Sequence, residues 1–185
     1  MTYYGGKELG ASFRTVRANT VRIAEDIPEG NYDFSAAPGC RSTGRTLAHI
    51  AFASGIQMHT HSNKIDDLKK VNFPELMHKL GAEEARPRTK AEIIALLKTE
   101  GDKFASFLES LSESFLAERV TMPPGAEPAT KSPFEMLLSP KEHEMHHRGQ
   151  LMVLERMLGL VPHLTRQFQD RMAQNRQAPQ QSQQA

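Results

Sequence analysis

Three of the eight histidines of the chain lie within five positions, in the stretch KEHEMHHRGQL at residues 141–151. His143 and His147 are four residues apart, so on a helix their side chains share one face, one turn from each other. Because that face continues as a stripe of leucines to Leu158, it is expected to pack inward. Burying an imidazole without a partner costs free energy. A divalent cation bound by both rings would remove that cost, since neutral imidazole nitrogen is a good ligand for zinc, nickel, copper or iron.

The spacing of this pair leaves more than one interpretation open. The order HExxH of zinc proteases is absent, because Glu144 is followed by Met145 and His146. That class of enzyme is therefore excluded. The alternative to a metal is that His143 and His147 form hydrogen bonds inside the core, or are partly exposed, in a bundle without any ion.

A mononuclear catalytic site needs a third protein ligand, and His49 is the best candidate. It lies within the apolar run LAHIAF, where an imidazole needs a reason. The other histidines fit less well. His59 and His61 lie near a polar helix end and are predicted to be exposed, and His78 has no clear helical phase. His146 points about 100° away from His147 round the helix and is predicted to face solvent or another subunit, and His163 is predicted to lie outside the bundle.

Four long helical patterns are expected to position these histidines. They run from about residue 7 to 27, from 42 or 43 to 63, from 89 to 115 and from 132 to about 158. The residues KIDDLKKVNFPELM are interpreted as a broken linker that stops at Pro74. Pro140 is expected to kink the last helix without ending it, and Gly159 to end it. The sequence thus predicts an all-α four-helix bundle with long crossover loops.

Composition sets limits on the class of protein. A length of 185 residues fits one domain, predicted as a bundle over 1–164 and a polar, Gln-rich tail over 165–185 that is disordered from about Ala173. The net charge of +1 argues against nucleic acid or a membrane surface as a partner. The one cysteine, Cys40, fits a reducing compartment, and no apolar leader is legible. We therefore expect a cytoplasmic protein.

The histidine in LAHI together with KEHEMHHRGQL resembles the DinB/YfiT-like family of metal-binding four-helix bundles, from the first helix to about Leu158. The resemblance implies a divalent metal held by His49, His143 and His147, and a homodimer. The metal could be zinc, nickel or iron, because sites of three histidines suit all of them.

The resemblance also carries the functional expectation. A metal held by three neutral rings can favour the deprotonated form of a water or a thiol. We therefore expect a metal-dependent thiol transferase or hydrolase that acts on a small molecule, with a low-molecular-weight thiol as a partner and a role in stress. The alternative is a non-catalytic, dimeric metal-binding protein used for interaction. Near the site, Gln150 is expected to support the metal ligands, Gly149 to allow a close approach, and Arg148 to face solvent.

Overall fold

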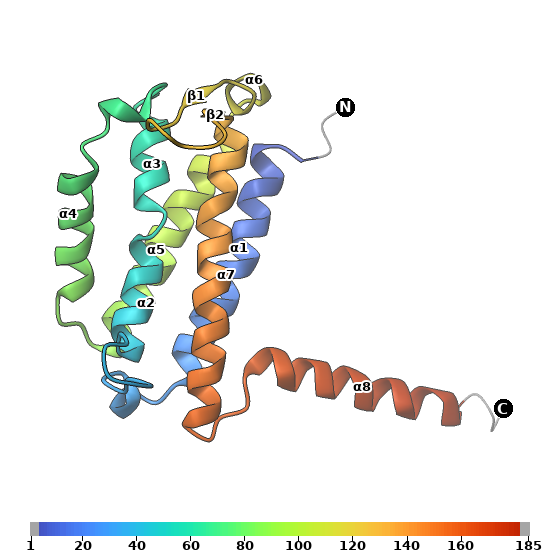
Figure 1. Cartoon of the computed structure of the whole chain (residues 1–185). Coiled ribbons are helices and arrows are strands. Elements are labelled where there is room, and N and C mark those ends of the chain that lie inside the picture. The colour runs from blue at the N-terminus through green and yellow to red at the C-terminus, as the bar shows by residue number, and fades with distance from the viewer. Residues whose placement is uncertain (1–3, 182–185) are drawn as a thin grey trace.

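Most of the protein is helical in the computed structural model, which describes residues 4–181 (Figure 1). The α-helices are α1 (Gly6–Asp26), α2 (Thr43–Phe52), α3 (Gly55–Ser62), α4 (Phe73–Ala85), α5 (Lys90–Glu109), α6 (Glu113–Leu116), α7 (Pro133–Met157) and α8 (His163–Gln181). Two 3-10 helices, η1 (Glu29–Asn31) and η2 (Leu68–Lys70), and an antiparallel strand pair, β1 (Val120–Thr121) and β2 (Thr130–Lys131), lie in the connections. A membrane crossing needs about 20 consecutive apolar residues, and none of the described helices offers such a run.

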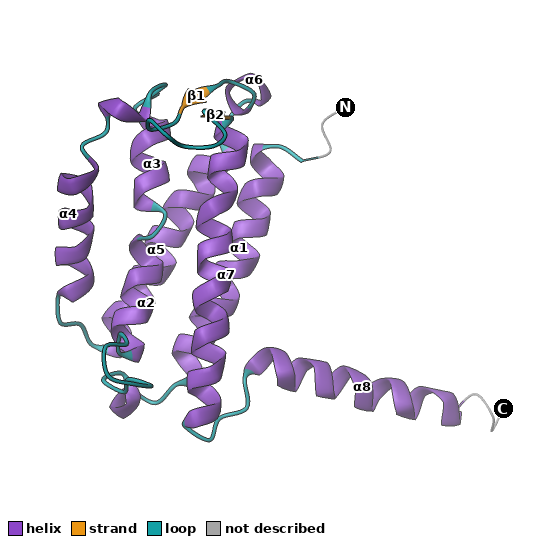
Figure 2. Cartoon of the chain, in the orientation of Figure 1, coloured by secondary structure: helices purple, strands orange, loops and turns teal. Residues whose placement is uncertain are grey.

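The predicted four-helix bundle is confirmed. Helix α1 packs on α5 and α7, and α2, continued by α3, completes the bundle against the same two helices (Figure 2). The core consists of apolar residues at three- and four-residue spacing. One half of it contains Ile23, Leu47, Leu97 and Leu151, and the other contains Phe13, Phe104, Leu108 and Leu137.

The helix ends follow the local signals in the sequence. Thr89 and Ser132 each accept a hydrogen bond from the backbone N–H three residues on, and the glutamate there bonds back to the capping residue. Helix α7 runs through Pro140 as one helix, as predicted. Gly159 follows it at φ +76°, a conformation that glycine adopts without a Cβ penalty.

The expected continuous second helix is interrupted. The helix is interrupted between Phe52 and Gly55, so that α2 and α3 are separate helices. Glycine is a weak helix former, and here a Cβ at position 55 would meet Leu80 of α4 at 3.2 Å. The missing Cβ of Gly55 therefore lets Leu80 of α4 pack closely against α3.

The linker predicted over residues 64–77 is wrong in its second half, because α4 begins there. Pro74 lies in the first turn of α4, where a missing N–H costs nothing, and so it starts the helix that it was expected to stop. The Asn72 side chain accepts a hydrogen bond from the N–H of Glu75 and caps this first turn. Helix α4 lies outside the bundle, beside α2 and α3 (Figure 1).

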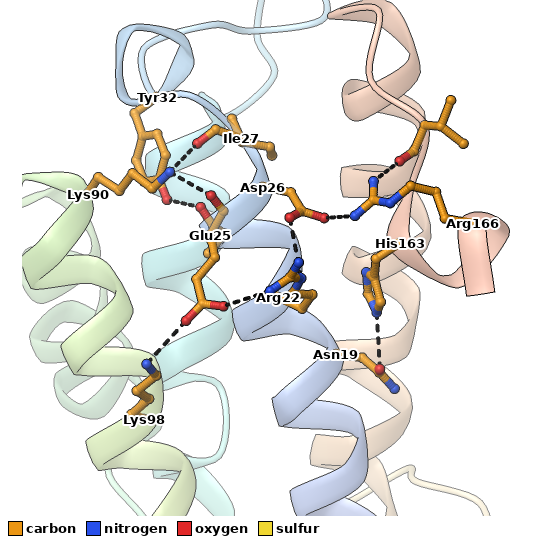
Figure 3. Close-up of polar contacts among 12 residues, drawn as sticks. Asn19, Arg22, Glu25, Asp26, Ile27, Tyr32, Lys90, Lys98, His163 and Arg166 are labelled. Atoms are coloured by element: carbon orange, nitrogen blue, oxygen red, sulfur yellow. Dashed lines mark hydrogen bonds and ion pairs between the residues drawn. The ribbon is translucent and has the colours of Figure 1, made fainter. Parts of the chain in front are cut away.

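Helix α8 occupies the segment that was predicted as a disordered tail. It projects away from the bundle (Figure 1) and is fixed at its first turn, where Arg166 pairs with Asp26 of α1 and His163 donates to Asn19 (Figure 3). Gln, Arg and Ala are acceptable helix formers, and a helix satisfies its backbone groups without burying apolar side chains. Residues 182–185 lie outside the described residues, and the domain boundary at 164 stays a prediction.

Near this anchor, α7 buries a carboxyl group. Glu155 is 0 % exposed, and neither of its carboxylate oxygens has a hydrogen-bond partner among the described residues. Burial, with a smaller contribution from Asp26, raises the pKa of Glu155 to about 7. The folded state therefore holds a proton on Glu155 at pH values where the unfolded chain has released it.

Replacing Glu155 by glutamine should remove this pH dependence of stability. Since the folded pKa of about 7 lies above the ordinary value of 4.5, the wild type keeps its full stability below pH 4.5 and loses part of it as pH rises through 7. Relative to wild type, the variant should gain on the order of 2–3 kcal/mol in the free energy of unfolding between pH 5 and pH 8. Urea unfolding at both pH values measures this, with Glu118→Gln at an exposed position as control. A constant difference between variant and wild type would contradict it.

Candidate metal centre

Three imidazole rings from two helices meet at the middle of the bundle. His49 comes from α2, and His143 and His147 come from successive turns of α7. His143 Nε2 lies 3.2 Å from His49 Nε2 and 3.1 Å from His147 Nε2. One ligand atom from each of the three residues lies within 4.8 Å of the others. The structure thus brings together the three residues that the sequence pointed to.

Two of these rings are held from outside the cluster. His49 Nδ1 lies 2.8 Å from Glu84 Oε2, and His147 Nδ1 lies 2.7 Å from Gln150 Oε1. Because both partners are acceptors, each Nδ1 carries the proton and donates it outward. Each Nε2 atom then presents its lone pair to the centre of the cluster, which is the arrangement typical of metal-ligating histidines.

The donor set fits a divalent transition metal. With the His49 and His147 lone pairs facing inward, a proton on His143 Nε2 can be donated to only one of them. A cation bound by three neutral nitrogens has no such restriction, and zinc, nickel and iron all accept histidine ligands. Burial, with the neighbouring histidines, lowers the pKa of His143 to about 4, and burial also lowers the pKa of His147. Both rings therefore stay neutral, the form that binds metals, at physiological pH.

Glu84 is the site residue that sequence reasoning missed. It lies on α4, in the segment whose beginning was interpreted as linker, and no local motif marks it. Its carboxylate accepts from Arg41 Nε at 2.6 Å and from His49, and Arg45 Nη2 lies 3.6 Å away. Burial alone would raise its pKa, but the bonds from Arg41 and His49 outweigh this and hold the pKa of Glu84 below its ordinary value. An ionised Glu84 is a strong acceptor for the His49 Nδ1–H.

The residues next to His147 were predicted with mixed success. The supporting place given to Gln150 agrees with its hydrogen bond to that ring. No part of the described chain, α1 included, approaches Gly149 closely, because a Cβ there would meet nothing within 4 Å. The alternative, that a partner approaches there, stays a prediction. Arg148 is partly exposed.

Of the remaining histidines, His146 lies beside the cluster: its ring centroid is 5.0 Å from that of His147, and its Nε2 lies 3.2 Å from Gln150 Nε2. His59, His78 and His146 are exposed, as predicted for His59 and His146. The expected exposure of His61 is wrong, because the α3 helix turns it inward to 3 % exposure, where burial lowers its pKa to about 4. His163 was placed outside the bundle, but it is 3 % exposed where α8 meets α1.

A buried ion pair lies beside the cluster. The Arg17 guanidinium donates to both carboxylate oxygens of Glu144, at 2.9 to 3.1 Å. It also donates to the carbonyl oxygens of Leu97 on α5 and Ile50 on α2. One side chain of α1 therefore contacts the three other bundle helices, at positions adjacent in sequence to His49 and His143.

Two clefts lead to the cluster from the surface. The first, of about 460 Å³, is lined by His49 and His143 among others, and the second, of about 690 Å³, is lined by His147. Glu84 lines both clefts. The three rings are thus accessible from two sides, and both volumes suit small molecules.

Comparison with known proteins agrees with this architecture. Residues 12–151 match the family model of the DinB superfamily, a range that includes all three histidines. The chain is 25% identical over 154 residues to protein YjoA of Bacillus subtilis strain 168, covering 82% of this chain and 90% of YjoA.

Solved structures match over a similar range. The crystal structure of YjoA superposes with a TM-score of 0.61 at 21% identity, over 82% of this chain and 92% of that one. A DinB-like protein from Bacillus cereus ATCC 10987 gives 0.64 at 19% identity, over 84% and 93%. YfiT from Bacillus subtilis, described as a probable metal-dependent hydrolase with an unusual four-helix bundle topology, gives 0.64 at 15% identity, over 86% and 91%. These likenesses establish the fold.

Proposed function

Because the chain belongs to the DinB superfamily, we propose that His49, His143 and His147 bind one divalent transition metal and that the protein is a metal-dependent enzyme acting on a small molecule. One observation supports this most directly. Three Nε2 atoms converge while outer acceptors hold the opposite nitrogens of two of the rings. Zinc, nickel and iron are all compatible with such a site.

The residues around the cluster define what it can do. The bound metal would supply a Lewis acid that favours the deprotonated form of a thiol or a water in the cleft. Glu84 and Gln150 fix the tautomers and orientations of His49 and His147. The clefts admit reactants from two sides of the cluster.

Of the two reaction classes, we favour a transferase that uses a low-molecular-weight thiol. The His49 and His143 rings line one cleft and His147 lines the other, an arrangement suited to two reactants meeting at one centre. The thiol loses its proton to solvent, its sulfur forms a bond to an electrophilic carbon of the second molecule, and the leaving group departs with the bonding electrons. The description of YfiT supports hydrolysis as the second candidate, with water in place of the thiol.

Turnover with a panel of biological thiols tests this function. Zinc-, nickel- and iron-loaded protein would be assayed for conjugation of monochlorobimane with glutathione, cysteine and coenzyme A, and for hydrolysis of p-nitrophenyl acetate. We expect conjugation above the uncatalysed rate in the wild type and in His78→Ala, and its loss in His147→Ala. Equal rates in wild type and His147→Ala would end the proposal, and ester hydrolysis alone would decide for the hydrolase.

A supporting role for Glu84 gives a sharper prediction about the metal. Glu84→Gln keeps the shape of the side chain but replaces the anionic acceptor of His49 Nδ1–H by a neutral one. Loss of such an outer partner is expected to weaken zinc binding about 10–100-fold. Competition with a chromophoric chelator measures the affinity. Glu83→Gln, the neighbouring residue paired with Arg88 at the surface, serves as control and should bind as wild type. A change of less than twofold in Glu84→Gln would contradict the role.

We also propose that the protein is a cytoplasmic homodimer with a role in detoxification or stress. The outward face of α7 exposes Met145, Val153 and Met157 at four-residue spacing around Gly149, and such an apolar stripe supports a homodimer. A cytoplasmic detoxification or stress role is consistent with a single, unpaired Cys40. The alternative, a non-catalytic dimeric metal-binding protein, would bind zinc but show none of the turnover described above.

A further inference from the structure

Two arginines lie beside the histidine cluster and line both clefts. Arg41 and Arg45 come from the segment that leads into α2 and from its first turn, and their side chains are 42% and 56% exposed. Arg41 uses Nε and Nη2 for Glu84. The only ion pair of Arg45 within the described structure is the loose contact of Nη2 with Glu84 at 3.6 Å. Most of the donors of both guanidinium groups therefore face the clefts without a partner.

The charge balance at this place is positive. Glu84 is the only carboxylate among the residues that line the two clefts, and it faces both Arg41 and Arg45. Two positive charges against one leave a net charge of +1 before any metal is counted. A bound divalent metal would add to it, because its histidine ligands are neutral. An anion in the cleft would be attracted by this field.

The first cleft also has apolar lining residues. Its lining includes the apolar side chains of Phe52, Ile56, Met77, Leu80 and Pro140. Gln57 also lines it, and its Oε1 atom is buried without a hydrogen-bond partner among the described residues. The cleft thus offers guanidinium donors and an apolar surface to the same molecule.

We propose that this cleft binds an organic carboxylate with an apolar body, its carboxylate held by Arg45 and Arg41 and its body packed against the Phe52 and Leu80 wall. A planar guanidinium matches a carboxylate with two parallel hydrogen bonds, from Nε and Nη2 or from Nη1 and Nη2. In Arg45 only Nη2 has a contact among the described residues, the loose one with Glu84 at 3.6 Å, so either pair of donors can turn to a ligand. The inference rests on the proposed function to the extent that the molecule bound here is the one on which the metal centre acts.

Binding of simple probes to the metal-free protein tests the proposal apart from any metal ligation of the carboxylate. Chemical-shift perturbation on EDTA-treated, full-length protein would compare hexanoate, hexanamide and inorganic phosphate. We expect hexanoate to bind at least about 10-fold more tightly than hexanamide, because only the carboxylate forms charge-assisted bonds. Phosphate should bind more weakly than hexanoate, because it leaves the apolar wall empty. Equal affinity for acid and amide, or tighter binding of phosphate, would overturn the assignment.

Variants at Arg45 locate the effect and separate it from metal binding. Arg45→Gln should lose at least about 10-fold in hexanoate affinity and leave hexanamide unchanged, whereas Arg45→Lys should retain part of the affinity. Undiminished hexanoate binding in Arg45→Gln would overturn the proposal. Zinc binding of Arg45→Gln is measured in parallel. A wild type that binds hexanoate but no zinc would refute the metal centre and support the carboxylate site. A wild type that binds zinc but not hexanoate would refute the carboxylate site and support the metal centre.

Discussion

Replacing His143 by alanine is expected to lower the affinity for zinc by more than about 100-fold, since removing a ligand should cost more than removing an outer partner of one. His143 is the central ring, with its Nε2 within 3.2 Å of the Nε2 atoms of both other histidines. Two imidazoles alone do not complete the three-protein-ligand set of a catalytic zinc site. Elemental analysis of protein dialysed against zinc should give close to one equivalent for wild type and almost none for the variant.

The same change is expected to spare the fold of the metal-free protein. Without a metal, the inward lone pairs of His49 and His147 compete for one proton of His143, so loss of that ring removes an unfavourable arrangement. In EDTA, the thermal midpoint of His143→Ala should fall below that of wild type by no more than the amount expected from the cavity that the missing ring leaves. His78→Ala, at an exposed position of α4, controls for loss of any histidine. One equivalent of zinc in His143→Ala would refute the three-histidine centre.

How far the site could be predicted depended on sequence distance. His143 and His147 are four residues apart, so local periodicity alone placed them on one face of α7. His49 could be nominated because an imidazole in an apolar run needs a partner. Glu84 could not, because its role depends on how α4 folds back onto α2, and no local pattern encodes that packing.

In the fold, too, features set by local interactions were predicted and features set by distant contacts were not. Capping signals at Thr89 and Ser132 are local hydrogen bonds, and the helices that they predict are present. The break before Gly55 was missed; Gly55 packs against Leu80, which lies 25 positions away in sequence. His61 was expected in solvent because its sequence neighbours are polar, yet α3 turns it inward. Where tertiary contact overrides local pattern, sequence reasoning had no signal to use.

Replacing Arg17 by methionine is expected to lower the free energy of unfolding by about 3–5 kcal/mol, because it leaves the Glu144 carboxylate buried without its counter-ion. The Arg17 and Glu144 side chains are 6% and 1% exposed, so water cannot compensate the lost charge. The neighbouring Arg14→Met on α1 is the matched control. Arg14 pairs with Asp102 and Glu109 at the surface, with 39% of its side chain exposed, and its loss should cost less than about 1 kcal/mol. Equal losses in urea unfolding would refute the distinction.

Arg17 also links the two helices that carry the histidines. It contacts the Ile50 carbonyl, next to His49, and the Glu144 side chain, next to His143. The double variant Arg17→Met, Glu144→Met removes both charges together, and such replacements are often neutral for stability. We expect it to recover most of the stability lost in Arg17→Met and yet to bind zinc more weakly than wild type, because the two helices that carry the histidines lose the contact that joins them. A double variant with wild-type stability and wild-type zinc affinity would show that the ion pair holds the helices together without setting the geometry of the histidines.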